Sequence, residues 1–275
     1  MSDRVTIAVD GGVADVRLNR PDKVNALDAA MFAAIVEAGD TLATDRSVRA
    51  IVLSGEGKGF CAGLDVAAFG MGGGGGLDSS PAGAADQPAF DLGARDRDRI
   101  TNAAQQAAYT WAEQPAPVIA AVHGVALGGG LQIALGADLR IVTPDARLSV
   151  LEIRWGLLPD MTGPQSLPRL VGLDVAKELC FTGRMVSGEE AVALGLATSL
   201  SDHPRDDALA LAQEIAAKNP HAIRGMKELL NASGTRPLAD SFREESRLMG
   251  TVIGTPNQIE ATLAYLEKRP PVFED

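Results

Sequence analysis

Apolar and polar residues alternate near the start of the chain, which is the pattern of strands with one buried face. Residues 5–9 (VTIAV) and 11–21 (GGVADVRLNRP) alternate in this way around a Gly-Gly pair, so the sequence predicts two strands joined by a tight turn. Residues 27–45 then carry apolar side chains at helical spacing, and Asp28 stands where an N-cap is expected. The opening therefore predicts a strand pair followed by a helix.

Short apolar runs follow in the middle of the chain, and each predicts a buried strand. They are residues 48–55 (VRAIVLSG), 117–124 (PVIAAVHG), 137–144 (ADLRIVTP) and 146–153 (ARLSVLEI). Strands that alternate with helices indicate an α/β core with parallel pairing. From about residue 174 the chain changes to successive helical segments. We therefore expect a core over residues 1–197 and a helical C-terminal region over residues 198–275.

Residues 70–88 (GMGGGGGLDSSPAGAADQP) differ from the rest because they are rich in glycine, serine and proline. Such a segment buries too little apolar surface to offset the entropy lost on ordering, so we expect it to be mobile. Two interpretations stay open at this point. It is either a flexible flap beside a ligand pocket or an inert insertion.

Composition narrows the possible functions. The chain has 275 residues, of which 46% are hydrophobic, and this is typical of a globular protein. Its net charge of −11 argues against nucleic acid as a partner, and no apolar run is long enough to span a membrane. Two cysteines are too few for a disulfide framework, and the N-terminus lacks the order of a secretory signal, so a cytoplasmic location is predicted. The histidines and cysteines show no metal-ligand spacing, so no metal site is expected.

Two glycine-rich turns carry the first chemical hypothesis. One is Gly63–Leu64 and the other is Gly128–Gly130, each placed between a predicted strand and a helix. Amide N–H groups at the start of a helix lack partners within that helix, so two such turns aimed at one point would form an oxyanion hole. For either turn alone an ordinary tight turn is the favoured interpretation, and it is the pair that suggests an oxyanion hole. A phosphate-binding loop is excluded because Lys58 is followed by Gly59.

Two other reactive side chains have simpler interpretations. Cys61 is a possible nucleophile, but no partner base can be identified near it in the sequence, so a small buried cysteine is favoured. His123 ends an apolar run and is more typical of a structural residue.

Six segments, spread over nearly the whole chain, together carry a family resemblance. They are NRPDKVNALD (19–28), GKGFCAGLDV (57–66), PVIAAVHGVALGGGLQIALGADLRI (117–141), LEIRWGLLPDMTGPQSLPRLVG (151–172), FTGRMVSGEEAVALGLA (181–197) and YLEKRPPVF (265–273). In this order they resemble the crotonase superfamily, the enoyl-CoA hydratase/isomerase family. The resemblance implies a spiral of ββα units with a helical trimerisation region that also covers the active site. It also implies a homotrimer or a dimer of trimers, and a coenzyme A thioester as substrate with no separate cofactor.

The resemblance carries specific roles onto this sequence. It implies that the backbone N–H groups of Leu64 and Gly129 form the oxyanion hole. It also implies that coenzyme A is contacted by Lys23, Val24, Ala26, Ala62 and Lys268. Arg269, next to Lys268, is a further basic side chain that could face the phosphates. Solvated surface side chains are an equally good interpretation of Lys23, Lys268 and Arg269.

One position departs from the family pattern. Typical hydratases of this family use two glutamates; the second matches Glu152, but the first matches the neutral Gln132. Asp160 stands where several enoyl-CoA and dienoyl-CoA isomerases carry their catalytic acid/base. We therefore expect Asp160 to be the principal proton shuttle, with Glu152 assisting. The alternatives are a helix cap for Asp160 and an ion pair with Arg154 or Arg140 for Glu152.

Three functional hypotheses follow. The first is an enoyl-CoA isomerase. The second is an enoyl-CoA hydratase that uses Glu152, with Gln132 orienting the water. The third is a non-catalytic acyl-CoA-binding protein that keeps the fold and lacks the chemistry. Two carboxylates in one apolar pocket would have different pKa values, which suits proton transfer.

Overall fold

The computed structural model describes residues 3–68, 93, 95 and 98–275. The predicted flap at residues 70–88 lies outside these residues, so both interpretations of it stay predictions.

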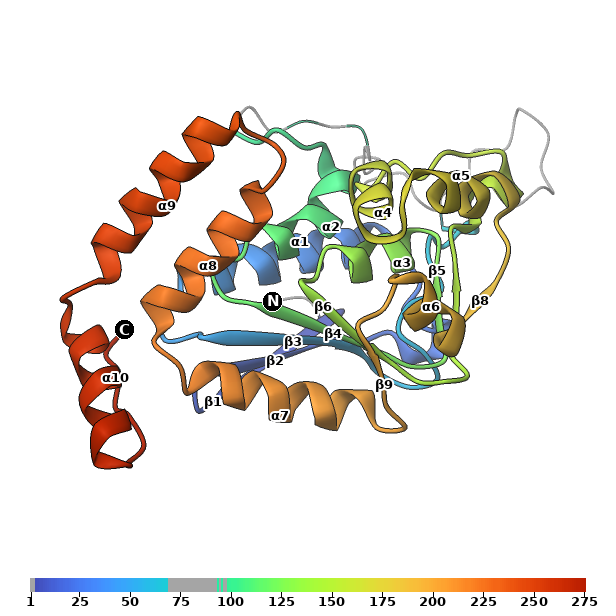
Figure 1. Cartoon of the computed structure of the whole chain (residues 1–275). Coiled ribbons are helices and arrows are strands. Elements are labelled where there is room, and N and C mark those ends of the chain that lie inside the picture. Colours follow the sequence, from blue (N-terminus) through green and yellow to red (C-terminus); the bar gives the residue numbers. More distant parts are fainter. Residues whose placement is uncertain (1–2, 69–92, 94, 96–97) are drawn as a thin grey trace.

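A large sheet forms the centre of the molecule (Figure 1). Its six strands lie in the order β1-β2-β3-β4-β6-β9. They are β1 (Val5–Asp10), β2 (Val13–Leu18), β3 (Ala50–Gly55), β4 (Val118–Val122), β6 (Leu139–Val142) and β9 (Ser199–Leu200). The first two strands are antiparallel across Gly11 and Gly12, both at positive φ, and every other neighbouring pair is parallel. The predicted α/β core with parallel pairing is therefore confirmed.

Helices cover both faces of the central strands β3 and β4, which is why these two strands are continuous apolar runs, whereas the edge strand β1 alternates. In β3, Ile51 and Leu53 pack into the larger core, while Ala50 and Val52 point to the opposite face. The larger core lies under α1 (Ala29–Thr44) and α2 (Ala103–Ala112), and the opposite face is covered by α7 (Pro204–Ala216) (Figure 1). Core packing thus continues past the predicted boundary at residue 197 to the end of α7.

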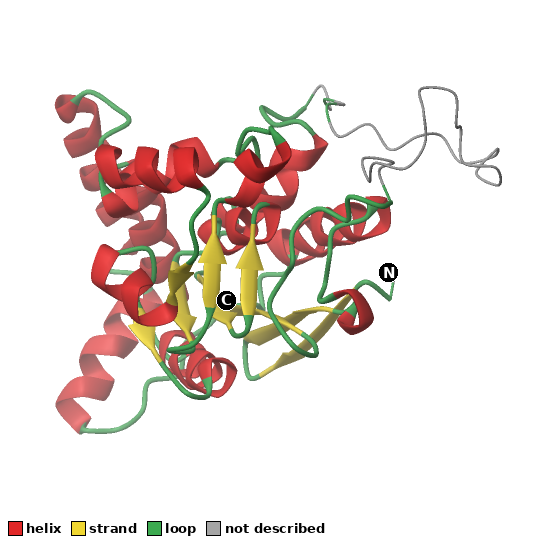
Figure 2. Cartoon of the chain, turned by 90° about the vertical axis from the view of Figure 1, so that its right-hand side faces the viewer, coloured by secondary structure: helices red, strands yellow, loops and turns green. Residues whose placement is uncertain are grey.

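A small second sheet stands at one end of the molecule, and Figure 2 turns that side toward the viewer. Its strands are β5 (Val125–Leu127), β7 (Arg147–Ser149) and β8 (Val186–Ser187), in the order β5-β7-β8. The short helices around it are η1 (Pro21–Lys23), α3 (Gly129–Leu135), η2 (Leu151–Trp155), α4 (Gly163–Val171), α5 (Leu173–Thr182) and α6 (Gly188–Leu194). The glycine turns and the candidate carboxylates all lie at this end.

The C-terminal region is helical, as predicted, and extends away from the sheet (Figure 1). It consists of α8 (Pro220–Ala232), α9 (Leu238–Val252) and α10 (Pro256–Glu267). Helix α9 buries none of its residues. The chain end returns to the sheet, where Arg49 bonds Asp275 and the Phe273 carbonyl. No helix in the described part of the chain is long and apolar enough to cross a membrane.

Candidate active site

The two glycine-rich turns lie against each other. Residues 61–65 run beside β5 on one side, where the Leu127 amide donates to the Cys61 carbonyl. On the other side they run beside Leu27, whose amide donates to the Gly63 carbonyl. A Cβ atom added to Gly63 would lie 2.5 Å from the Leu127 carbonyl oxygen and 3.7 Å from the Gly129 nitrogen. The sequence-predicted turns are therefore neighbours in space.

The amide groups at these turns include two without partners. Among the hydrogen bonds of residues 3–68, 93, 95 and 98–275, none uses the N–H of Leu64 or of Gly129 as its donor. Gly129 is the first residue of α3, so its N–H has no acceptor within the helix. The arrangement leaves two neighbouring backbone donors available to an oxygen atom.

Each glycine of the second turn has a physical reason to be glycine. Gly128 has φ of 51°, a conformation that side chains disfavour. A Cβ on Gly129 would lie 2.9 Å from the Met161 sulfur, and one on Gly130 would lie 2.5 Å from the Cys61 carbonyl oxygen. Positive φ and close packing, rather than helix propensity, thus explain the three glycines.

Gln132 and Glu152 form a buried pair directly beside this turn. The Nε2 of Gln132, on α3, donates to the Oε1 of Glu152, on η2, at 2.6 Å. Gln132 is 1% exposed and Glu152 is 9% exposed. A Cβ on Gly128 would lie 3.3 Å from that same Oε1, so the carboxylate is adjacent to the residue that precedes Gly129. Glu152 Oε2 is buried and lacks a hydrogen-bond partner within the described structure.

The Gln132 carbonyl oxygen is also fully engaged. It accepts hydrogen bonds from the amides of Met161 and Gly163, each at 2.9 Å. The Met161 amide belongs to the loop between η2 and α4, which carries Asp160, and Gly163 is the first residue of α4. The hypothesis that Gln132 orients a water is therefore restricted to its one remaining N–H, because both lone pairs of its carbonyl oxygen are used.

The surroundings of Glu152 favour its protonated form more than water does. Burial raises the pKa of Glu152 above its ordinary value, because the charged form is poorly solvated there. The hydrogen bond from Gln132 lowers the pKa, and the negative charge of Asp160 raises it further, so the net shift is upward. A carboxyl group with this environment suits general acid/base work.

Asp160 lies in the loop before α4 and is exposed. Thr162, not Asp160, is the residue that precedes the first turn of α4, so the helix-cap alternative is wrong. The ion-pair alternative for Glu152 is also wrong for the residues that the structure describes. Arg140, for example, donates instead to the carbonyls of Leu196 and Ala137.

Four of the residues predicted to contact coenzyme A lie together. Lys23 is exposed at the end of η1, and Val24 and Asn25 follow in left-handed conformations with φ of 49° and 55°. The Ala62 amide donates to the Val24 carbonyl at 2.9 Å, which joins this loop to the Gly63 turn. Ala26 continues the same loop.

Lys268 is not brought to this loop within one chain. It follows α10, which extends at the opposite side of the molecule from the small sheet (Figure 1). Arg269 beside it is bonded to Glu260 of the same helix at 2.8 Å. A joint role for Lys23 and Lys268 would require the Lys268 of a second copy.

Cys61 and His123 have structural contacts. The Cys61 thiol is buried and donates to the Asn25 carbonyl at 3.1 Å. Burial raises the pKa of the thiol to about 12, so it stays protonated. The preferred interpretation of Cys61 as a small buried residue is confirmed. The ring of His123 contacts the Gly57 carbonyl at 3.0 Å.

An Arg20–Asp65 ion pair supports the first turn, and sequence reasoning missed it. The guanidinium of Arg20 lies 2.8 Å from Asp65, the residue after Leu64, and also donates to the Ala26 carbonyl. Burial raises the pKa of Asp65, but the hydrogen bonds from Arg20 and the Ala68 amide, together with the nearby positive charges, outweigh it and the net shift is downward. Nothing in the separate segments around residues 20 and 65 signals this pairing.

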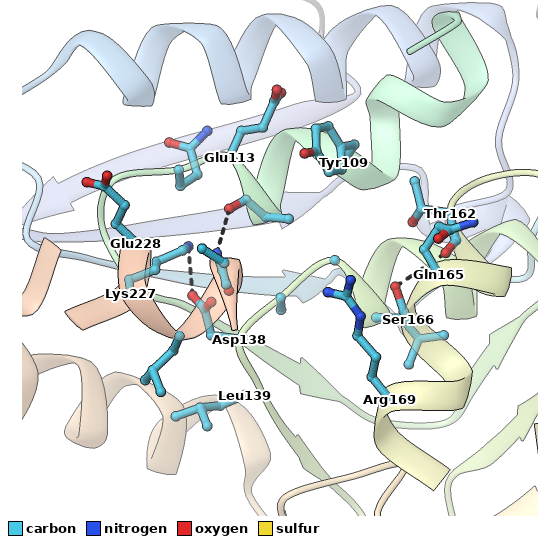
Figure 3. A pocket seen from close by; sticks show the side chains of 18 of the residues that line it. Tyr109, Glu113, Asp138, Leu139, Thr162, Gln165, Ser166, Arg169, Lys227 and Glu228 are labelled. Carbon is cyan, nitrogen blue, oxygen red and sulfur yellow. Dashed lines mark hydrogen bonds and ion pairs between the residues drawn. The ribbon is translucent and has the colours of Figure 1, made fainter. Parts of the chain in front are cut away.

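A separate cavity of about 950 Å³ lies at the other end of α3, between α2, α4 and α8 (Figure 3). The figure shows Lys227 of α8 reaching Asp138, and their charged atoms are 2.8 Å apart. Lys227 is 8% exposed and also donates to the carbonyls of Trp111 and Ala116. Gly129 is at the opposite end of the helix, so this cavity is distinct from the candidate active site.

Comparison with known proteins identifies the family. The sequence profile of "Enoyl-CoA hydratase/isomerase" matches residues 13–271, which is nearly the whole chain. The chain belongs to the enoyl-CoA hydratase/isomerase family. This family member is 33% identical to a probable enoyl-CoA hydratase of Bacillus subtilis over 98% of both chains. It is equally similar, 33%, to the (E)-benzylidenesuccinyl-CoA hydratase of Thauera aromatica, again over 98% of both chains.

Solved structures of this family have the same fold. The crystal structure of a putative enoyl-CoA hydratase from Streptomyces coelicolor A3(2) superposes with a TM-score of 0.84 at 34% identity. The match covers 98% of this chain and 94% of that one. The expected crotonase fold is therefore confirmed, and this enoyl-CoA hydratase/isomerase family member is an acyl-CoA enzyme.

Proposed function

We propose that this enzyme moves the double bond of an enoyl-CoA thioester. The observation that carries the proposal is the buried Gln132–Glu152 pair, which offers one carboxylate instead of two beside the Gly129 amide. Double-bond migration needs a base that removes a proton and an acid that returns it, and one carboxyl group can do both. Hydration needs in addition a bound and activated water.

In this mechanism the thioester oxygen accepts hydrogen bonds from the N–H groups of Leu64 and Gly129. Glu152 removes a proton from the carbon next to the carbonyl, and the electron pair moves into the thioester as an enolate. The two backbone donors stabilise the oxygen's negative charge, and one such donor is worth about 2.7–4 kcal/mol in comparable enzymes. Protonation two carbons away completes the shift and regenerates the carbonyl.

The geometry favours Glu152, rather than the Asp160 expected from the sequence, as the residue that removes the proton. Asp160 was expected to be the principal shuttle, but it is exposed, whereas Glu152 is buried beside Gly128. We therefore assign removal of the proton next to the carbonyl to Glu152. Asp160, which is exposed, takes a proton from solvent and passes it to the distant carbon, and Glu152 releases the abstracted proton to solvent before the next turnover. Glu152 Oε2 is covered from solvent, so the substrate reaches it only after neighbouring side chains shift.

Hydration is the second candidate because relatives named above are called hydratases. The two reactions are separated by incubating the enzyme with a trans-2-enoyl-CoA and with a 3-enoyl-CoA. Isomerisation generates the ultraviolet absorbance of the conjugated thioester from the 3-enoyl substrate, and hydration removes it from the 2-enoyl substrate. Tight coenzyme A binding without turnover of any thioester in a panel would instead support a non-catalytic acyl-CoA-binding protein.

Substitution of Asp160 tests the proposed roles. Asp160→Asn removes a proton carrier with little change in volume, so we expect it to abolish isomerisation while thioester binding remains. The measurement is the rate of absorbance gain together with the affinity for a saturated acyl-CoA. Turnover close to that of the unmodified enzyme would contradict the assignment of Asp160.

We also propose that copies of this chain assemble as a trimer or a dimer of trimers. Helix α9 buries none of its residues, and large apolar side chains are exposed along the C-terminal helices, such as Phe242 (56%), Ile253 (65%) and Tyr265 (83%). Apolar surface of this kind is stabilised by burial against a partner. Light scattering after size-exclusion chromatography measures the number of copies.

A further inference from the structure

Gln132 uses nearly all of its hydrogen-bonding capacity inside the protein. Its carbonyl oxygen accepts from two backbone amides, Met161 and Gly163, which can only donate. Its Nε2 must then be the atom that faces Glu152, at 2.6 Å from Oε1. The orientation of the amide is therefore dictated by the backbone and does not depend on the charge of Glu152.

This fixed orientation has a consequence for the neighbouring carboxyl group. Because the Nε2 of Gln132 can only donate, Oε1 of Glu152 has to accept, whether the carboxyl group is ionised or protonated. A proton on Glu152 is therefore favoured on Oε2, because a hydroxyl oxygen at Oε1 would be a weaker acceptor for the Gln132 N–H than a carbonyl oxygen. Oε2 is the oxygen atom without a partner in the described structure.

We propose that Gln132 is a positioning residue that directs the transferable proton to Oε2 of Glu152 and holds the Asp160 loop at the same point. The proposal rests on the proposed use of Glu152 as a base, and it applies to isomerisation and to hydration alike. Gln132 itself exchanges no proton with the substrate. It acts through Glu152 and through the amides of Met161 and Gly163.

The charge balance explains why an amide suits this position. Two side chains shift the pKa of Glu152: Gln132 from α3 lowers it, and the charge of Asp160 from the following loop already raises it. Cys180 from α5 also faces Glu152, and its own pKa is raised by burial and by the charge of Glu152. A glutamate at position 132 would add an oxygen at hydrogen-bond distance from Oε1, and two ionised carboxylates cannot share that distance without a proton between them.

Two substitutions and one matched control test the proposal. Gln132→Met keeps the length of the side chain and removes its hydrogen bonds, whereas Gln132→Glu keeps the acceptor for both amides. Gln114→Met is the control, because Gln114 is equally buried and donates to the Gly39 and Thr110 carbonyls away from this site. Thermal unfolding shows how far each change lowers stability, and the two methionine variants are compared at equal folded fraction.

The main readout is exchange of deuterium from heavy water into the carbon next to the carbonyl of a saturated acyl-CoA, measured by mass spectrometry across pH. We expect kcat for Gln132→Met to fall about 100-fold through misplacement of the base, with KM little changed and with Gln114→Met unaffected. Gln132→Glu should exchange well at low pH, where the pair shares a proton, and lose rate as pH rises. An unchanged rate and pH profile in both Gln132 variants would overturn the proposal.

A second readout separates this proposal from the proposed function. The carboxyl carbon of Glu152, labelled with carbon-13 and assigned with Glu152→Gln, reports its titration by NMR without any turnover. Loss of the Gln132 donor should move the titration midpoint upward in Gln132→Met. If the unmodified enzyme catalyses no exchange, the proposed function fails, and the midpoint still decides the role of Gln132. An unshifted midpoint would contradict that role.

Discussion

Two polar pairs lie on either side of helix α3, and they differ in how many of their polar atoms are hydrogen-bonded. At the start of the helix, Gln132 donates to Glu152 beside the glycine turn. Just beyond its end, Lys227 of α8 contacts Asp138 at 2.8 Å. Each pair joins segments that are distant in the sequence. Each also contains an ionisable group that burial would neutralise if it stood alone.

The difference lies in how completely each pair is satisfied. Lys227 donates to two backbone carbonyls as well as to Asp138, and Asp138 also accepts from the Val118 amide. Neither side chain has a buried atom without a partner in the described part of the chain. Glu152, in contrast, keeps Oε2 unpartnered. A buried pair whose polar atoms are all hydrogen-bonded is typical of a structural role. A buried oxygen without a partner, near backbone amides without partners, is typical of a ligand-binding site.

The largest expected effect concerns the incompletely satisfied pair. Glu152→Gln removes the base, so we expect kcat to fall by about 10²–10⁴-fold, as for other acid/base residues. Affinity for a saturated acyl-CoA should change little, because the volume is kept. Stopped assays of isomerisation and exchange measure the rate. A variant that retains most of its activity would show that the unpartnered oxygen is not the reacting atom.

The same substitution has a pH-dependent effect on stability, with a sign set by the raised pKa. A group whose pKa is raised by folding stabilises the protein at pH below its unfolded value, here 4.5, and loses that contribution as pH rises through the folded value. Glu152→Gln avoids this loss. Its free energy of unfolding relative to the unmodified protein should therefore increase with pH, and urea unfolding at several pH values measures it.

Breaking the Lys227–Asp138 pair should lower stability and leave kcat nearly unchanged, the reverse of the effect expected for Glu152→Gln. Lys227→Met leaves the half-buried Asp138 without its counter-charge and two backbone carbonyls without their donor. We therefore expect a loss of about 3 kcal/mol in the free energy of unfolding, the lower end of the range for a fully buried pair. The folded fraction should keep nearly all of its kcat. Lys218→Met is the control, since Lys218 lies just after α7 and its side chain is 57% exposed. A large fall in kcat without loss of stability would mean that this end of α3 also belongs to the catalytic machinery.

Sequence reasoning predicted the two glycine turns and most of the fold because these are local patterns. The strands around Gly11 and Gly12 follow from alternation, and Asp28 caps α1 by accepting from the Met31 amide as predicted. Helices α2 and α4 were not predicted as separate elements. Helix α4 contains Pro168 within only 9 residues, which obscures its helical pattern.

The bonds inside the site were beyond prediction because they join distant segments. Gln132 contacts amides 29 and 31 residues further along the chain, and those amides leave no signature in the side chains of Met161 or Gly163. Lys227 is equally concealed. In the sequence it is one polar position on a predicted helix, and its acceptors are the carbonyls of Ala116 and Trp111, 111 and 116 residues away. Only the tertiary structure shows which polar residues are buried.

A smaller effect is expected from the ion pair that supports the first glycine turn. Asp65→Asn weakens the contact with Arg20, and hydrogen bonds to charged groups are worth about 1.5–3 kcal/mol. The pKa of Asp65 is lowered by folding, so its stabilisation is present above its unfolded value of 3.8 and is lost as pH falls through the folded value.

The pH dependence is thus opposite in sign to that of Glu152. Chemical unfolding of Asp65→Asn and of the unmodified protein between acid and neutral pH measures this difference. We expect the two proteins to converge in stability at low pH, because the unmodified protein then loses the charge of Asp65. A constant difference across the whole range would show that the Arg20 contact does not depend on that charge.

The smallest effect is expected from substitution of an exposed lysine, whose charge is solvated rather than buried. Lys23 is exposed on the loop that joins the Gly63 turn, and we propose that it contacts the phosphates of coenzyme A. Exposed ion pairs are worth about 0.2–1 kcal/mol, so Lys23→Ala should raise KM for an acyl-CoA only a few-fold. Because salt screens exposed charges, the difference should vanish at high ionic strength, while kcat and the unfolding midpoint stay unchanged. Lys218→Ala, on the opposite face of the large sheet, should leave KM unaltered at any salt concentration. A KM that is insensitive to both substitutions would remove Lys23 from the proposed coenzyme A site without affecting the assignment of Glu152.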